Sequence, residues 1–145
     1  METTDERTSA LIAEAARRNE SLRQLADEGA VTFSKANPFV RVLLGKMIRS
    51  GVGMSIDELG VKVREFSALL ARLRSGQESL EAARPAIRDY AGLTRKAIAY
   101  VESLESMSGR IKDHEQRARI IEMTRARVED TRRLTDVLDE LGGAR

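Results

Sequence analysis

The single histidine is the side chain of this sequence best suited to acid–base catalysis or metal binding, and its surroundings favour neither. His114 stands between Asp113 and Glu115. Residues adjacent in a helix point in different directions, so neither carboxylate faces the imidazole ring. The chain has no cysteine and no second histidine, and it therefore lacks the H-E-x-x-H spacing of zinc proteases. We expect no metal centre and place His114 on the surface or in a helix seam.

The carboxylates and glycines also lack the arrangements that catalysis or cofactor binding requires. Carboxylates precede basic residues by four positions, as Glu14 precedes Arg18, which is the spacing of ion pairs on an exposed helix. The Gly-Lys pair at 45–46 lacks the other residues of a phosphate-binding loop, and the glycines at 51 and 53 lack a third glycine. No Gly-x-Ser-x-Gly nucleophile motif occurs. The sequence therefore predicts no enzyme, no cofactor and no small-molecule substrate.

The composition is typical of packed helices. Among 145 residues, 41% are hydrophobic, 33% are charged and only 3% are aromatic, with two prolines. The core volume must come from aliphatic residues, which suits helices packed side by side better than twisted sheets. The length fits one domain. We predict a single all-α domain over residues 1–145.

The chain shows no membrane or export signal. The N-terminal stretch is acidic and lacks the basic and then apolar regions of a signal peptide. The most apolar stretch, residues 39–54, is interrupted by Arg41, Lys46 and Arg49, and it is shorter than the roughly 20 residues that a membrane span needs. The chain has no cysteine and therefore no disulfide bond, and we expect a soluble, cytoplasmic protein.

Hydrophobic periodicity and capping signals divide the chain into helices. A capping box, Thr3-x-x-Glu6, opens the first helix, and Gly29 is expected to end it. Arg18 takes the place of the middle residue in the apolar stripe of this helix. The segment 29–37 is expected to be a connection with a short extended part. The predicted helices are residues 4–28, 38–50, 56–74, 77–107 and 110–141.

Pro85 lies inside the predicted helix 77–107. Proline removes a backbone donor, so it either starts a new helix or kinks a long one. An unbroken helix of this length would measure about 46 Å at 1.5 Å per residue. That is more than a compact domain of this size requires, so we predict a kink or a break near Pro85.

The helix 38–50 is apolar on nearly all its faces, with Asn37 and Pro38 as its expected N-cap and first position. A helix that is apolar all round is normally buried all round. We therefore predict that it lies at the centre of a bundle. An oligomer contact and a membrane-surface helix remain as alternatives.

The helix 56–74 has the most regular pattern in the chain. It begins at a second capping box, Ser55-x-x-Glu58. Its apolar residues alternate at three and four positions, the heptad pattern of coiled coils and of helices that cross at shallow angles. The candidate interaction seam consists of Ile56, Leu59, Val63, Phe66, Leu70 and Leu73.

The last helix, 110–141, has a weaker apolar pattern. Thr124, Thr131 and Thr135 interrupt one of its two apolar stripes. A stripe diluted by threonine buries less apolar surface than one of Leu and Ile. The predicted fold is therefore a four- to five-helix bundle with a long, partly exposed C-terminal helix.

Basic residues gather in the middle of the chain. The net charge is +2, but residues 35–74 hold eight basic and three acidic side chains, a net +5. The glycine-containing turn between helices 38–50 and 56–74 has the outline of a helix-turn-helix. The candidate polyanion-binding residues are Arg41, Lys46, Arg49, Lys62, Arg64, Arg72 and Arg74.

These observations favour a non-catalytic protein. We predict an interaction or structural module that self-associates or docks into a larger protein assembly. This prediction rests on the heptad seam, on the helix 38–50 that is apolar on nearly all its faces, and on the long helices. The alternative is a nucleic-acid-binding regulator that uses residues 35–74, whose affinity would fall steeply with salt. A membrane-surface role has less support, because helix 38–50 has almost no polar face.

Overall fold

The computed structural model describes residues 4–35, 38–107 and 114–143, and within them it contains five α-helices and no strand. The helices are α1 (Thr4–Lys35), α2 (Pro38–Val52), α3 (Ile56–Ser75), α4 (Leu80–Met107) and α5 (His114–Gly142). The predicted all-α bundle is confirmed. The position of Thr3 in the first capping box lies outside the described residues.

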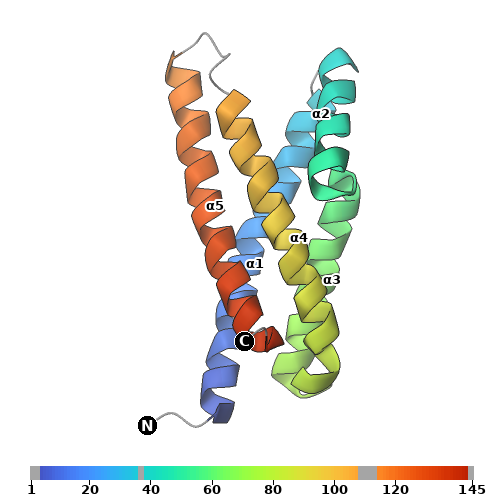
Figure 1. Ribbon diagram of the computed structural model, residues 1–145, viewed down its shortest axis with the longest axis vertical. Coiled ribbons are helices and arrows are strands. Elements are labelled where there is room, and N and C mark those ends of the chain that lie inside the picture. Colours follow the sequence, from blue (N-terminus) through green and yellow to red (C-terminus); the bar gives the residue numbers. More distant parts are fainter. Residues whose placement is uncertain (1–3, 36–37, 108–113, 144–145) are drawn as a thin grey trace.

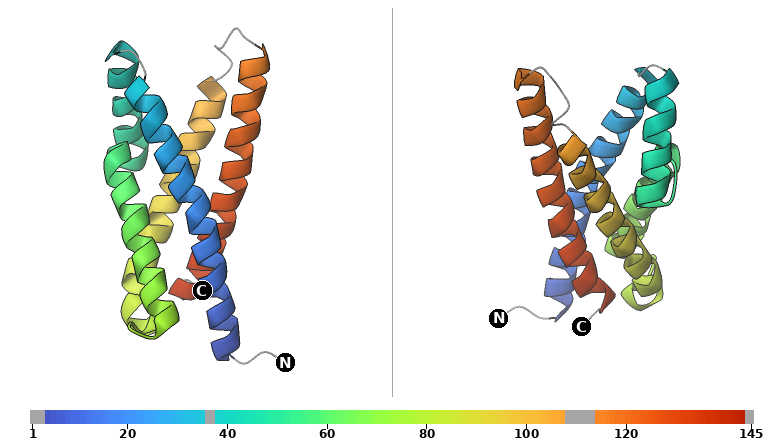
Figure 2. Two further views of the ribbon diagram at one scale, coloured as in Figure 1. Left: turned by 180° about the vertical axis from the view of Figure 1, so that it is seen from behind. Right: turned by 45° about the horizontal axis from the view of Figure 1, so that its top comes forward.

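The helices form an up-and-down bundle of four rods (Figures 1 and 2). α1 runs from one end to the other, and α2 and α3 return one after the other in the same direction, so that together they make the second rod. α4 runs up again and α5 runs down. α5 packs along both α4 and α1, α3 packs along α1, and α2 packs mainly on α4.

The core is a single cluster of aliphatic side chains with two stacked aromatic rings. Leu22 of α1, Val63 of α3, Ile87 of α4 and Leu134 of α5 are each no more than 1% exposed. The rings of Phe66 and Tyr90 stack with their centroids 3.9 Å apart, joining α3 to α4.

Local signals set the ends of α3 as predicted. The Ser55 hydroxyl accepts a hydrogen bond from the backbone N–H of Glu58 at 3.2 Å, which is the capping interaction that the sequence predicts. At the other end Gly76 adopts φ 79°, and its N–H donates to the carbonyls of Arg72 and Leu73. Glycine adopts this left-handed conformation without the steric penalty of a Cβ atom.

α1 continues past Gly29 to Lys35, so the predicted stop at Gly29 and the extended segment within 29–37 were wrong. Glycine permits a left-handed cap but does not impose one, and inside a helix it costs only about 1 kcal/mol relative to alanine. The helix ends shortly before Pro38, since proline disfavours helical backbone in the residue before it.

α4 runs without a break through Pro85, so a break there is wrong, whereas a kink at Pro85 stays a prediction. The helix begins at Leu80 rather than Gln77. The Ser79 hydroxyl caps it by accepting from the N–H of Ala82 at 3.2 Å. Pro85 is exposed and lies near the start of the helix, where its missing N–H removes a single hydrogen bond, to Glu81. Water can reach the freed carbonyl there.

α2 is not the central helix, contrary to the prediction. It lies at the edge of the bundle beside α4 (Figure 1), and it exposes 78% of Phe39 and 60% of Val42. The other four helices bury most of one another's apolar stripes, and α2 packs mainly on α4, so its described apolar side chains are buried on one side and exposed on the other.

Candidate functional site

The outward face of α2 carries the most exposed large hydrophobic side chains among the described residues. Phe39, Val42, Lys46 and Arg49 recur at spacings of three, four and three, which places them on one face of a helix. We call these four residues the α2 stripe. Its two apolar residues are 78% and 60% exposed, and its two basic residues are also exposed. Val31, 52% exposed, lies near the C-terminal end of α1, shortly before α2 in the chain.

The inward face of α2 fixes the direction of this stripe. Ile48 and Val52 are buried, with exposed fractions of 4% and 1%. Gly51 lies against α4 so closely that a Cβ atom there would be 3.6 Å from the ring of Tyr100. Because these contacts hold one side of α2 to the bundle, Phe39 and Val42 on the other side face away from it. Lys46 is exposed and also lines a shallow hollow between α2 and α4, beside Tyr100.

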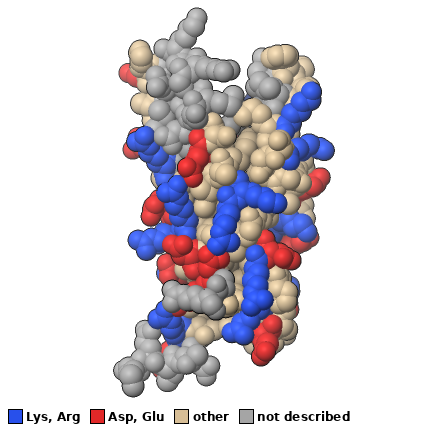
Figure 3. Space-filling model, viewed as in Figure 1, with Lys and Arg blue, Asp and Glu red and all other residues tan. Residues whose placement is uncertain are grey.

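The charge of α2 has one sign. Its residues include Arg41, Lys46 and Arg49 and no carboxylate, and all three are exposed. None of them forms an ion pair with another residue that the structure describes. In Figure 3, basic side chains lie over the upper right, where α2 is placed in Figure 1, whereas both signs mix over the lower half.

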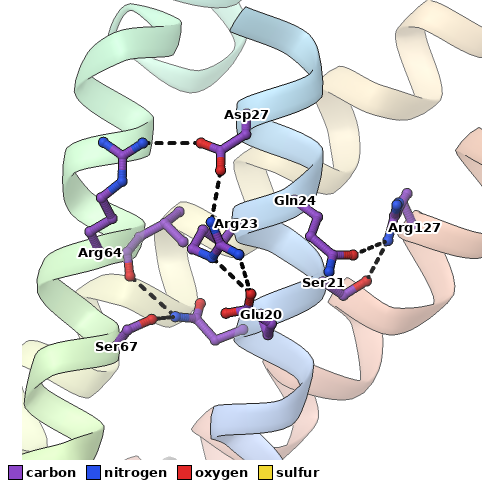
Figure 4. Close-up of polar contacts among 10 residues, drawn as sticks. Glu20, Ser21, Arg23, Gln24, Asp27, Arg64, Ser67 and Arg127 are labelled. Atoms are coloured by element: carbon purple, nitrogen blue, oxygen red, sulfur yellow. Dashed lines mark hydrogen bonds and ion pairs between the residues drawn. The ribbon is translucent and has the colours of Figure 1, made fainter.

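The other candidate polyanion-binding residues belong to α3, and three of these four take part in ion pairs. Arg64 contacts Asp27 at 3.1 Å (Figure 4), Arg72 contacts Glu78 at 3.1 Å, and Lys62 contacts Glu65 at 3.7 Å. Arg74 lies at the far end of α3 from α2. The seven basic residues therefore spread along the whole second rod instead of forming one patch.

The predicted helix-turn-helix arrangement is absent between α2 and α3. The two helices follow each other along one direction, joined through Gly53 with φ 87°, and they do not pack side by side (Figures 1 and 2). A recognition helix needs a second helix across it to present it to the major groove. α2 and α3 therefore do not form a helix-turn-helix.

The predicted interaction seam lies inside the bundle of this chain. Five of its members are buried and Ile56 is partly buried against them. α1 covers most of this face, and Tyr90 of α4 covers Phe66. The seam therefore stabilises the monomeric fold, and its apolar surface is already covered within the chain.

A buried polar cluster joins three helices, and the sequence analysis missed it. Asn19 of α1 is fully buried, and its amide nitrogen donates to the Val63 carbonyl at 3.2 Å and the Ser67 hydroxyl at 2.9 Å. The Tyr90 hydroxyl donates to the Asn19 side-chain oxygen. Burial raises the pKa of Tyr90 well above its ordinary value. This cluster is satisfied within the chain and offers no open position to a ligand.

One spacing in the sequence points to Asn19. Ala15 precedes it by four residues and Leu22 follows it by three, so it lies on the apolar stripe of α1. The spacing of the apolar residues predicted Arg18 at this position. In the structure Arg18 instead lies beside the stripe and forms an ion pair with Asp130 of α5 at 2.6 Å.

Polar side chains also line the contact between α1 and α5. Arg127 donates to the Ser21 hydroxyl at 3.1 Å and to the Gln24 oxygen at 3.3 Å (Figure 4), and it pairs with Glu28 at 3.1 Å. The Ser21 hydroxyl donates to Asp130 at 2.9 Å. These contacts are all within the chain, so they stabilise the bundle.

A groove of about 730 Å³ separates α3 from α4. Phe66, Leu69 and Tyr90 line it, yet each is at most 6% exposed, so its floor belongs to the core. Charged side chains of both signs form its rim, including Asp89 and Lys96. Unlike the α2 stripe, the groove holds no large hydrophobic side chain that is highly exposed among the described residues.

Within the described residues, no three His, Cys, Asp or Glu side chains gather closely enough to hold a metal ion. His114 is exposed at the start of α5. No helix among the residues that the structure describes is both long enough and apolar enough to cross a membrane.

A comparison of the chain with protein-family models, with curated proteins and with solved structures finds no match.

Proposed function

We propose that this chain is a non-catalytic helical module that docks onto another protein through the α2 stripe. One observation carries the proposal: Phe39 is 78% exposed, beside a Val42 that is 60% exposed, on a helix whose other face is held by the core. Aromatic side chains on a rigid element are the usual anchors of protein interfaces. An exposed apolar group of this kind is typical of an interaction surface.

The two apolar residues of the stripe can contribute a substantial part of a binding energy. Burying a Phe or Val side chain contributes about 1.5–3 kcal/mol. A gain of about 1.4 kcal/mol raises an affinity tenfold, so the two side chains together supply a factor of at least about 100. Because α2 is already helical and attached, little of this gain is lost in ordering the binding surface.

Nucleic-acid binding through residues 35–74 is the weaker candidate. Three of the seven basic residues are in ion pairs, and α2 and α3 do not form the expected motif. Phosphate contacts would use Arg41, Lys46 and Arg49 and leave Phe39 in water.

The proposal is tested by a photo-crosslinking amino acid, benzoylphenylalanine, placed at Phe39 in the full chain expressed in its own cells. We expect a discrete protein adduct that disappears when Val42→Asp is added. The matched control carries the crosslinker at Val61, which is 48% exposed on α3 and lies outside the stripe. The mass of the adduct separates a second copy of this chain from a different protein.

Three results would contradict protein docking at α2. These are the absence of an adduct at position 39, equal adducts at positions 39 and 61, and an adduct with nucleic acid only. Size-exclusion chromatography with light scattering, recorded at 260 nm and at low and high salt, shows in parallel whether the purified chain carries nucleic acid.

A further inference from the structure

We infer that the partner of the α2 stripe is an acidic amphipathic helix of another protein, a conclusion that rests on the proposed docking function. The stripe is linear: the ten residue steps from Phe39 to Arg49 span about 15 Å at 1.5 Å per residue. Its first half is apolar and its second half is basic. A partner helix of three or four turns matches this line if it places aliphatic residues at one end and carboxylates at the other.

Charge determines the chemistry of the partner. α2 holds three basic residues and no carboxylate, and its cations have no ion-pair partner within the described chain. Carboxylates are the natural counter-charges, because Arg and Lys form charge-assisted hydrogen bonds with them. The apolar pair supplies affinity, and the basic pair selects an acidic partner over a neutral or basic one.

A second copy of this chain fits the stripe poorly. The four stripe positions are symmetric, so two stripes packed antiparallel would place Phe39 opposite Arg49 and Val42 opposite Lys46 of the other copy. Such a contact covers each basic residue with an apolar side chain of the other copy, and neither α2 supplies a carboxylate to pair with it. Burying a charge without a counter-charge costs free energy, so this contact is unfavourable.

An anionic membrane also fits less well than a protein helix. A helix that lies in a membrane surface inserts a whole apolar face. The apolar face of α2 that contains Ile48 and Val52 is occupied by the bundle, and on the stripe two apolar residues remain. Lys46 and Arg49 lie in line with these residues instead of on an opposite polar face.

The inference is tested by fluorescence anisotropy with a labelled 21-residue helical probe peptide that carries Leu at three- and four-residue spacing and Glu on its flanks. We expect the full chain to bind this peptide, and Phe39→Ala to weaken binding at least tenfold. The double variant Lys46→Glu/Arg49→Glu should abolish binding of the Glu peptide and create binding of a matched peptide with Lys in place of Glu.

The matched control is Lys96→Glu/Arg74→Glu, which reverses two exposed charges outside the stripe that form no ion pair with described residues. It should change the affinity for the Glu peptide less than twofold. A loss as large as that of the stripe variant would assign binding to the α3–α4 groove or to overall charge, and would overturn the inference.

Equal binding of a scrambled Glu peptide, or no effect of the stripe charge reversal, would also overturn it. So would stripe-dependent binding to phosphatidylserine vesicles or to duplex DNA without binding to the Glu peptide. If the crosslinked adduct at position 39 still forms after the charge reversal, the docking function stands and the acidic partner is wrong. If no adduct forms at all, docking itself fails.

Discussion

At the scale of single residues, Asn19 and Tyr90 set how the helices meet. A buried amide that bonds to α3 and α4 together can be satisfied in one register of the three helices only. Moving any of them by a turn would leave a buried polar group without a partner, which costs about 1–3 kcal/mol. The cluster therefore favours one packing arrangement over its alternatives.

Tyr90→Phe is expected to lower the free energy of unfolding by about 1–3 kcal/mol at neutral pH, because the Asn19 oxygen loses its donor while the ring stack is kept. Urea unfolding followed by circular dichroism measures the loss. Tyr100→Phe is the matched control, since Tyr100 is only partly buried and has no hydrogen-bond partner among the described residues. An equal loss in both variants would show that the Tyr90 hydroxyl has no special role.

The same variant has a consequence at high pH. Burial raises the pKa of Tyr90 above its ordinary value of 10.0, so the folded protein keeps a proton that the unfolded chain releases. Its contribution to stability is therefore complete below about pH 10 and is lost as the pH rises further. The stability of the native sequence should fall more steeply between about pH 10 and pH 11.5 than that of Tyr90→Phe. Parallel curves would contradict this.

At the scale of helices, two glycines with different conformations show what a helix end requires. Gly76 ends α3 with φ 79°, whereas Gly92 lies inside α4 with nothing within 4 Å of where its Cβ would stand. The left-handed conformation at Gly76 is strained for a residue with a Cβ atom. Gly92, in contrast, weakens a helix that has room for a methyl group at that position.

We therefore expect two identical substitutions to act in opposite directions. Gly76→Ala should destabilise the protein by about 1–2 kcal/mol, because alanine is strained in the left-handed region. Gly92→Ala should stabilise it by about 0.5–1 kcal/mol. Thermal unfolding of both variants beside the native chain measures the pair. A stabilising Gly76→Ala would mean that α3 does not end at this cap.

α2 shows how far a helix pattern can be interpreted without its neighbours. Its sequence is apolar on nearly every face, which predicted burial on every face. Among the side chains that the structure describes, Ile48 and Val52 are buried and Phe39 remains exposed, and α2 packs mainly on α4. The number of apolar faces that a helix buries depends on how many other helices can reach it.

At the scale of the whole molecule, the chain separates a core that holds the bundle from an edge helix that is free to bind. Phe66 and Phe39 are the same residue type in these two places, with exposed fractions of 4% and 78%. A charge at the first position must be buried among apolar side chains, and a charge at the second stays in water.

Phe66→Asp is therefore expected to abolish cooperative folding, whereas Phe39→Asp should shift the free energy of unfolding by less than about 0.5 kcal/mol. Circular dichroism and urea unfolding of the two purified variants distinguish them. A large loss for Phe39→Asp would show that this side chain contributes to the fold, and would remove the basis for docking at the α2 stripe.

The sequence was sufficient to predict the helical class, a bundle of four to five helices with most of their ends, and the cap at Ser55, because these depend on periodicity and on neighbours within one turn. Of the four residues of the α2 stripe, Lys46 and Arg49 were among the predicted polyanion-binding residues. Their grouping with Phe39 and Val42 on one exposed face was not predicted.

Only the tertiary structure decided which apolar faces are buried within the chain and which stay exposed. It placed the heptad seam inside the chain, left α2 at the edge, carried α1 through Gly29 and α4 through Pro85, and buried Asn19 between α3 and α4. The covered seam, the edge position of α2 and the burial of Asn19 depend on residues far apart in the sequence. Burial requires two helices that pack against each other. The apolar pattern of one helix shows which of its faces can be buried, but it does not show which helix will cover that face.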